Sequence, residues 1–305
     1  MIVDERARAR LVDRFGPGVA AWCDAFPALL ASLTRRWELT VDADASGNTG
    51  RTLLCHNNSG EFVVLKLTPD LEVARTEATA LRAWSNCPHV VDVLDADLDR
   101  GALLLAGIQP GTPLTSTPRQ LPELLAEIHG VSLPATGVDG ADPDKQVGGV
   151  GCADPDKQVG GRIITLVERV EFMFALAERT RVDALGGSVG LLRRSREAAL
   201  ELAADGPTAL LHGDFHQRNL LDGGARGPVI IDPRPCLGDP AFDAIDWALL
   251  PMRDGDPPHY DIPGIDGDRL RRWCECIAVL AAGAALRRGD RSHANALLDL
   301  AKESR

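Results

Sequence analysis

Two short polar segments, each entered from an apolar run, carry the side chains best suited to chemistry. In the first, residues 210–219 (LLHGDFHQRN), the carboxylate of Asp214 stands five positions before the carboxamide of Asn219. In the second, residues 229–233 (VIIDP), Asp232 ends an apolar strand. Phosphoryl transfer to a hydroxyl needs a carboxylate that accepts the hydroxyl proton and oxygen ligands for the Mg²⁺ ions that bridge the phosphates. These three side chains supply that set.

The spacing of the three side chains supports this interpretation. Residues 222–228 (DGGARGP) read as a hairpin turn, which would bring Asn219 and Asp232 to the same end of two strands. The interval from Asp214 to Asn219 matches the catalytic loop of protein kinases, and Asp232 stands where their metal-binding aspartate stands. We therefore predict Asp214 as the base and Asn219 and Asp232 as magnesium ligands. Taken singly, each would more simply be a turn or capping residue.

A rival interpretation takes His212, Asp214 and His216 as a metal-ligand run that, together with Asp232, would suit a zinc hydrolase. It gives no role to Asn219 or to the N-terminal third of the chain. We favour a His212 imidazole that fixes the loop by hydrogen bonding. We expect His216 to point toward the loop or the substrate.

Two further carboxylates follow in residues 237–243 (LGDPAFD), which open a helix. Asp239 precedes a proline at the first helical position and is predicted to be the N-cap. Asp243 lies one helical turn later and could bind the loop that contains His212. We predict a scaffold role for both carboxylates rather than a catalytic one.

A second set of candidate residues lies in the N-terminal third, where Lys66 interrupts an apolar strand, residues 62–67 (FVVLKL). A lysine there either reaches water along its own alkyl chain or meets an anion such as the phosphates of a nucleotide. Glu77, in the following helix, could pair with Lys66 as kinases pair a strand lysine with a helix glutamate. Glu72 is the competitor for that role.

Two more positions are candidates for nucleotide contact. Ser46 opens a turn cluster, residues 46–50 (SGNTG), where a hairpin that covers the phosphates is expected. The cluster lacks the G-x-G-x-x-G form, so an ordinary β-turn stays an open alternative. The adenine is expected to hydrogen-bond to the backbone around Ala106, a contact that leaves no side-chain signature.

The elements that must position these residues divide into two lobes. Residues 1–106 predict a small antiparallel sheet around one helix, with strands at 37–44, 51–56, 62–67, 90–94 and 102–106 and the helix at 71–84. A glycine- and proline-rich hinge follows, and residues 107–305 predict a mainly helical lobe with helices near 118–130, 163–184, 189–204, 240–252, 268–287 and 291–302. A strand-rich stretch at 209–232 interrupts these helices. The predicted class is α+β, with two lobes.

Composition narrows the possible partners. The 305 residues are 45% hydrophobic and 25% charged, which is ordinary for a folded protein. A net charge of −11 repels a phosphate backbone, so we expect no nucleic-acid partner. No run approaches the ~20 apolar residues of a membrane helix, and the N-terminus has no apolar signal core. We expect a cytoplasmic protein with no membrane partner.

Two features are expected to lie outside the chemistry. The seven cysteines form no CxxC pair and are predicted to be reduced, buried thiols. Residues 141–149 (ADPDKQVGG) recur letter for letter as residues 153–161, and two copies of a unit with almost nothing to bury are too few for a repeat fold. We interpret the segment at 141–161 as a duplicated surface loop.

The sequence resembles the aminoglycoside phosphotransferase family, whose fold is protein-kinase-like. Residues 212–216 (HGDFH) with Asn219, residues 231–233 (IDP) and residues 238–243 (GDPAFD) carry this resemblance. Residues 26–30 (FPALL), 36–39 (RWEL) and 80–84 (ALRAW) resemble the branch of streptomycin 6-kinases and hydroxyurea phosphotransferases. The resemblance covers nearly the whole chain apart from the duplicated segment.

The resemblance implies ATP- and Mg²⁺-dependent transfer of the γ-phosphate to a hydroxyl of a small molecule. Asp214 would be the base, Asn219 and Asp232 the magnesium ligands, and Lys66 with Glu77 the clamp on the phosphates. A cationic antibiotic such as streptomycin is the expected acceptor. The alternatives are hydroxyurea, a sugar, a nucleoside antibiotic, or a module that binds nucleotide without catalysis. A protein kinase is disfavoured because no Ala-Pro-Glu segment follows Asp232.

Overall fold

The computed structural model describes residues 3–46, 50–132, 161–181 and 189–304. Apart from Gly161, the duplicated segment lies outside the described residues. The chain divides into two compact units. The first holds the residues up to Thr112 together with Leu221–Ile231, Gly161 and Arg162, and the second holds the rest.

A five-stranded sheet forms the centre of the first unit. Its order is β1-β2-β3-β5-β4, and every neighbouring pair is antiparallel. The strands are β1 (Thr40–Ser46), β2 (Arg51–His56), β3 (Phe62–Leu67), β4 (Val93–Asp97) and β5 (Ala102–Ala106). The predicted strands at 51–56, 62–67 and 102–106 are confirmed. Because side chains alternate along a strand, the buried Val63, Leu65 and Leu67 share one face of β3, and Lys66 lies on the other.

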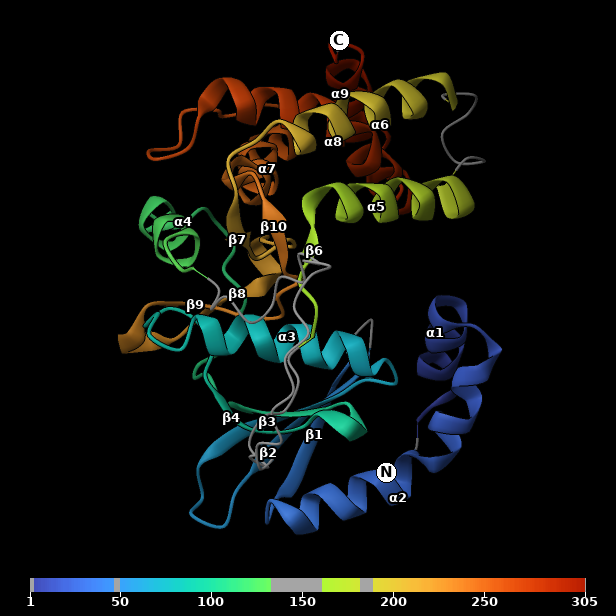
Figure 1. Ribbon diagram of the computed structural model, residues 1–305, viewed down its shortest axis with the longest axis vertical. Coiled ribbons are helices and arrows are strands. Elements are labelled where there is room, and N and C mark those ends of the chain that lie inside the picture. Colours follow the sequence, from blue (N-terminus) through green and yellow to red (C-terminus); the bar gives the residue numbers. More distant parts are fainter. Residues whose placement is uncertain (1–2, 47–49, 133–160, 182–188, 305) are drawn as a thin grey trace, which may run out of the picture. The chain divides into compact units, whose positions relative to one another are not determined.

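Helices cover both faces of this sheet (Figure 1). On one face α2 (Ala20–Arg36) packs Phe26, Leu30 and Leu33 against apolar side chains of β2, β3 and β5. On the other face lies α3 (Leu71–Ala83), whose first turn is capped by the Asp70 carboxylate. Because the two faces of the sheet are covered by different helices, β3 can pack Val63, Leu65 and Leu67 into the core on the α2 side and present Lys66 on the α3 side.

The expectation of one helix in the N-terminal third was wrong. Both α1 (Glu5–Phe15) and α2 precede the sheet. Pro27 stands inside α2, and because an interior proline removes a backbone hydrogen bond, it usually ends a helical pattern. Burial of Phe26 and Leu30 on the sheet accounts for a helix that the sequence pattern alone does not favour.

The second unit is mainly helical, as predicted. Its longer helices are α4 (Leu121–His129), α5 (Leu166–Arg181), α6 (Val189–Ala204), α8 (Gly267–Arg287) and α9 (Arg291–Ala301). A small sheet, ordered β6-β10-β7, joins Ile164–Thr165, Cys236–Gly238 and Ala209–Leu211. The strands β8 (Leu220–Asp222) and β9 (Pro228–Ile230), which apart from Leu220 belong to the first unit, form the predicted hairpin. The single helix expected over 240–252 is instead a short α7 (Ile245–Ala248) flanked by 3₁₀ turns.

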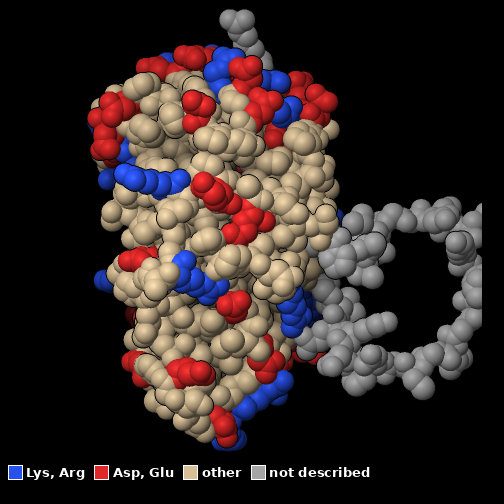
Figure 2. Space-filling model, turned by 90° about the vertical axis from the view of Figure 1, so that its left-hand side faces the viewer, with Lys and Arg blue, Asp and Glu red and all other residues tan. Residues whose placement is uncertain are grey.

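The surface and the helices bear on the expected partners. On the face drawn in Figure 2 acidic and basic side chains lie interspersed rather than gathered by sign. Among the described residues no helix is long and apolar enough to cross a membrane. The six cysteines that the structure describes are free and buried, as predicted.

Asp239 joins the small sheet of the second unit to its long helix. Its carboxylate accepts hydrogen bonds from the backbone N–H of Ala241, from Arg269 Nε at 2.6 Å and from Trp273 Nε1 at 2.8 Å. The Asp239 side chain is buried, and both side-chain donors belong to α8. The predicted N-cap is therefore also a buried anchor for α8.

Replacing Asp239 with alanine should lower the free energy of unfolding by about 3 kcal/mol, because the buried Arg269 and Trp273 donors lose their acceptor. Asp266→Ala is the control, since Asp266 caps α8 at the surface and its loss should remove only about 1 kcal/mol. Denaturant unfolding of both variants measures the difference. Equal losses would show that Asp239 acts as a cap alone.

Candidate active site

The loop from β7 to β8 carries Asp214 and is shaped by a glycine that precedes it. Gly213 has φ +73°, and a Cβ at this position would lie 2.0 Å from the Arg234 carbonyl oxygen. The Arg234 N–H in turn donates to the His212 carbonyl at 2.8 Å. Only glycine tolerates this backbone angle together with so close an approach. The segment that follows Asp232 therefore runs directly beside the segment that leads to Asp214.

A buried carboxylate holds the same loop from within. Asp243 accepts hydrogen bonds from the backbone N–H groups of His212, at 2.7 Å, and Gly213, at 2.8 Å. His129 Nε2 lies 3.0 Å from the same carboxylate. Burial raises the pKa of Asp243, but its hydrogen bond to His129, the charges of both histidines and the Gly213 amide outweigh burial, so this pKa is lowered overall. Asp243 binds the loop from below, as expected from the sequence.

Asp214 itself is partly open to solvent, with 40% of its side chain exposed. Its backbone N–H donates to His212 Nδ1 at 3.2 Å, and its carbonyl accepts the Asn219 Nδ2 donor at 2.9 Å. Backbone contacts thus hold the residue while its carboxylate stays accessible. This is the arrangement that a base acting on a bound hydroxyl requires.

The two predicted magnesium ligands flank the β8–β9 hairpin, one before its first strand and one after its second. Asn219 directly precedes β8 and Asp232 follows β9, so the antiparallel hairpin brings both to its open end. The Asn219 Nδ2 donates to the Asp214 carbonyl, which leaves the amide oxygen of Asn219 available to a metal ion. The Asp232 carboxylate is 38% exposed and lies 3.8 Å from Arg234 Nη2. Two oxygen donors of this kind fit Mg²⁺.

Asp232 also has an unusual backbone. Its φ of 55° falls in the left-handed region, which residues other than glycine, asparagine and aspartate rarely enter. Such conformations cluster at functional sites because the surrounding structure holds them in place. Among the described residues other than glycine, Glu38 is the second with a positive φ, at 52°, so the backbone of Asp232 supports the motif without identifying it alone.

The histidines of the loop do not resemble metal ligands. The His212 ring is fully buried, its Nδ1 accepts the Asp214 amide, and its face lies against Phe215, with ring centroids 5.4 Å apart. His216 Nε2 lies 3.9 Å from the Asp214 carboxylate. Among the described residues no group of three histidine, cysteine, aspartate or glutamate side chains could hold a metal ion. The preferred interpretation of His212 as a fixing residue agrees with these contacts.

In the first unit, Lys66 and Glu77 form the expected ion pair. Lys66 Nζ lies 2.6 Å from Glu77 Oε1 and 2.7 Å from Oε2. The lysine side chain is 14% exposed and the glutamate 2%. The competitor Glu72 is instead exposed and accepts the backbone N–H of Arg162 at 2.9 Å. A buried two-point contact orients the lysine ammonium group.

The structure gives less support to the two remaining residues predicted to contact the nucleotide, Ser46 and Ala106. Ser46 is the last residue of β1, and the rest of its turn cluster up to residue 49 lies outside the described residues. Ala106 ends β5, and its backbone N–H already donates to the Asp92 carbonyl at 2.9 Å. The Gly107 N–H likewise donates to the Phe62 carbonyl at 3.1 Å. An adenine contact at Ala106 stays a prediction, and it would have to use other backbone atoms.

Two functional candidates escaped the sequence analysis. Arg169, on α5, donates from Nη2 to the Gly213 carbonyl at 2.9 Å. Burial lowers the pKa of this guanidinium, while the carboxylates of Asp214 and Asp243 act in the opposite direction. Asp246, on α7, lies close enough to Asp214 that burial and the charge of Asp214 both raise the pKa of Asp246. Neither residue belongs to a short motif, so only the folded chain reveals them.

Replacing Asp243 with asparagine should destabilise the protein by roughly 3 kcal/mol at neutral pH, because the buried amides of the loop lose a charged acceptor. The lowered pKa of Asp243 makes this contribution complete above its unfolded value of 3.8 and lost as the pH falls through the lower folded value. Denaturant unfolding at pH 7 and below pH 4 measures the gap between wild type and variant. A gap that does not narrow in acid would contradict a charged, hydrogen-bonded Asp243.

The chain is similar in sequence to small-molecule kinases. It is 30% identical to a streptomycin 6-kinase of Streptomyces glaucescens, over 98% of this chain and 91% of that protein. It is 28% identical to a hydroxyurea phosphotransferase of Kitasatospora aureofaciens, over 82% and 70% of the two chains. These are the relatives of the branch expected from the sequence.

Solved structures show the fold. The choline kinase LicA of Streptococcus pneumoniae matches with a TM-score of 0.59 at 12% identity, over 92% of this chain and 98% of that one. The GDP and kanamycin complex of APH(2")-IIia matches with a TM-score of 0.54 at 15% identity, over 90% and 97%. The predicted α+β, protein-kinase-like fold is confirmed. The model described as "Phosphotransferase enzyme family" matches residues 40–275, most of the chain and all of the loop and hairpin described above, and this chain therefore belongs to that family.

Proposed function

We propose that this protein is an ATP- and Mg²⁺-dependent phosphotransferase that moves the γ-phosphate to a hydroxyl of a small molecule, with an aminoglycoside such as streptomycin as the first acceptor to test. The observation that carries the proposal is the accessible Asp214 carboxylate on a loop whose backbone is fixed by the buried Asp243. The streptomycin 6-kinase relative supports the choice of acceptor. The free, buried cysteines suit the reducing cytoplasm, where ATP is available.

Asp214 acts on the acceptor. Its carboxylate orients the attacking hydroxyl and takes its proton as the oxygen bonds to phosphorus. The γ-phosphoryl group leaves ADP, and the proton remains on Asp214 until solvent removes it. The amide contacts on either side of Asp214 hold the carboxylate in place, which matters because small displacements of a reacting group are expensive in rate.

The other named residues bind the nucleotide. Lys66, oriented by Glu77, places a positive charge on the phosphates. The Asn219 amide oxygen and the Asp232 carboxylate would hold Mg²⁺, which when bound neutralises the charge that develops on the phosphates. Ser46 and the Ala106 backbone are proposed as further nucleotide contacts. The GDP complex of APH(2")-IIia supports nucleotide binding by this fold.

The acceptor is identified by measuring transfer of labelled γ-phosphate to a panel of streptomycin, other aminoglycosides, hydroxyurea, sugars and nucleoside antibiotics. Hydroxyurea belongs in the panel because a second relative is a hydroxyurea phosphotransferase. We expect Mg²⁺-dependent transfer to at least one member, and Asp214→Asn should lower kcat by about 10²–10⁴-fold with little change in nucleotide affinity. The matched control is Asp261→Asn, at an exposed loop carboxylate.

Two outcomes would contradict the proposal. Near-normal turnover in Asp214→Asn would remove this residue from the role of base. Binding of ATP without transfer to any acceptor would favour the non-catalytic nucleotide module instead.

Glu77→Gln should lower kcat/KM for ATP by about 10–100-fold, because the neutral amide no longer holds the Lys66 ammonium by a charged two-point contact. Glu72→Gln is the matched control on the same helix, since Glu72 is exposed and contacts Arg162 rather than Lys66. Steady-state kinetics with varied ATP compare the two. Equal effects of both substitutions would exclude a specific clamp at Glu77.

A further inference from the structure

A small pocket of the second unit borders the loop that carries Asp214 and has no role in the phosphotransferase mechanism proposed above. Its volume is about 190 Å³, and its lining includes His216 of the loop, Asp246 of α7 and side chains from α8 and α9. Pockets that enclose a whole drug-sized ligand measure about 300–1,000 Å³. This pocket therefore suits one chemical group or a small ion rather than an entire aminoglycoside.

Three arginine residues from separate elements line this pocket. Arg218 comes from the catalytic loop, Arg253 from the 3₁₀ turn Leu250–Asp254, and Arg288 from the end of α8. All three side chains are exposed, and within the described part of the chain none lies within 4 Å of a carboxylate. The one side-chain partner among them is Gln217, which accepts from Arg253 at 3.4 Å. Arginines brought together without carboxylate partners are suited to binding carboxylates or phosphates.

The electrostatic environment shows that these arginines act on common neighbours. Burial lowers the pKa of His293, and the charge of Asp290 opposes this while the charges of Arg253 and Arg288 add to it. Arg253 also lies close enough to Asp246 to lower the pKa of that carboxyl, against the effect of burial. The positive charges of Arg288, at the end of α8, and of Arg253, in the turn after α7, therefore both act on the part of the pocket lined by His293.

His293 supplies an unused polar atom at the same place. Its side chain is 8% exposed, and its Nδ1 is buried without a hydrogen-bond partner in the structure. The nearest carboxylate, that of Asp290, lies 3.9 Å away and is the N-cap of α9. His293 therefore lines the pocket from α9 while its Nδ1 stays inside the protein, on the side of Asp290.

The single carboxylate of the lining does not cancel this charge. Asp246 faces Asp214 and His216 on the side of the catalytic loop, and Arg218 and Arg253 both act on it. The charged residues of the lining, histidines aside, are thus three arginines and one aspartate, while the carboxylates of Asp214 and Asp290 act on it from outside. The chain as a whole carries −11, so a lining with more arginines than carboxylates runs against the average of the protein.

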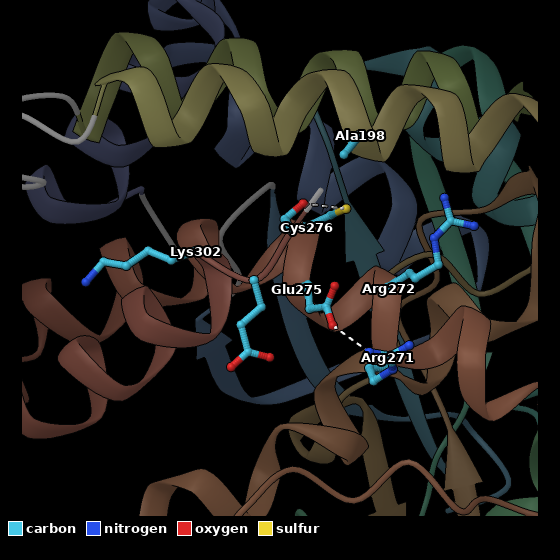
Figure 3. Close-up of a pocket in the computed structure, with 8 residues that line it drawn as sticks. Ala198, Arg271, Arg272, Glu275, Cys276 and Lys302 are labelled. Atoms are coloured by element: carbon cyan, nitrogen blue, oxygen red, sulfur yellow. Dashed lines mark hydrogen bonds and ion pairs between the residues drawn. The ribbon is translucent and has the colours of Figure 1, made fainter.

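A larger pocket of the second unit, about 590 Å³ in volume, lacks this convergence of basic side chains. Figure 3 shows Arg272 and Lys302 pointing away from each other, and Glu275 turned toward Arg271, which lies 3.5 Å from it. Its basic groups are thus divided between a carboxylate partner and solvent. They do not surround a common space.

We propose that the pocket bounded by Arg218, Arg253 and Arg288 binds an anionic group, a phosphate or a carboxylate, of a small molecule. The group could be a substituent of the acceptor or a free phosphate ion, and the chemistry of recognition is the same. An aminoglycoside carries no such group, so this site is additional to the acceptor contacts proposed above. Binding here does not depend on turnover, and its test can fail independently of the phosphotransferase proposal.

Isothermal titration of the full chain with inorganic phosphate at low ionic strength tests the site. We expect saturable binding in the wild type, a dissociation constant at least about tenfold higher in Arg288→Gln and in Arg253→Gln, as loss of one charged hydrogen bond predicts, and no change in Arg287→Gln. Arg287 is the matched control because it is exposed at the same helix end and does not line the pocket. Wild-type affinity in both pocket variants, or no phosphate binding by the wild type, would overturn the proposal.

Chemical modification provides a measurement that needs no variant. Phosphate should protect Arg253 and Arg288 from phenylglyoxal, as read by mass spectrometry, and leave Arg287 reactive. Uniform reactivity with and without phosphate would also overturn the proposal. A kinetic arm separates the two sources: phosphate that raises the KM of the identified acceptor indicates an anionic substituent of that acceptor, and phosphate without this effect indicates a site for the free ion.

Discussion

The catalytic loop depends on one buried carboxylate that touches no substrate. Asp243 accepts the backbone N–H groups of His212 and Gly213 and meets His129 at 3.0 Å, so a charge without access to water is compensated from three directions. Two of these donors are amides immediately before Asp214. The carboxylate therefore fixes the path of the backbone rather than the conformation of one side chain, and the position of Asp214, the proposed base, follows from that path.

Other contacts restrict the same three residues of backbone. Arg169 donates to the Gly213 carbonyl, and the Arg234 carbonyl leaves no room for a Cβ at Gly213. A loop held at its amides, its carbonyl and its Cα can keep an exposed carboxylate within the narrow range of positions that catalysis tolerates. The other side of the loop, which bears His216 and Arg218, is held by the Asn219 contacts to the Asp214 and His216 carbonyls, and it borders the pocket.

The sequence predicts most of what depends on local pattern and on short motifs. The alternation in residues 62–67 gives β3 and identifies Lys66 as the exception on it, and the Asp-Pro pair at 239–240 gives the cap. Contacts that depend on packing between distant elements lie beyond such patterns. The interior proline makes the sequence of α2 look unlike a helix, and the helix is explained only by the burial of Phe26 on the sheet. Arg169 lies on α5, far along the chain from the Gly213 carbonyl that it binds. No spacing rule joins such pairs, because tertiary packing alone brings them together.

The family match covers the short motifs of the proposed transfer site more completely than it covers the pocket beside the loop. The family match spans residues 40–275 and so includes Asp214, Asn219 and Asp232, whereas Arg288 and His293 lie beyond its end. The 30% identity to the streptomycin 6-kinase extends over 98% of this chain and so spans both regions. The α8–α9 corner contributes Arg288 and His293 to the pocket for which we propose an anionic ligand. Arginines do not attract a polycation, so the proposed anion site and the proposed aminoglycoside acceptor would use separate contacts on either side of the loop that bears His216 and Arg218.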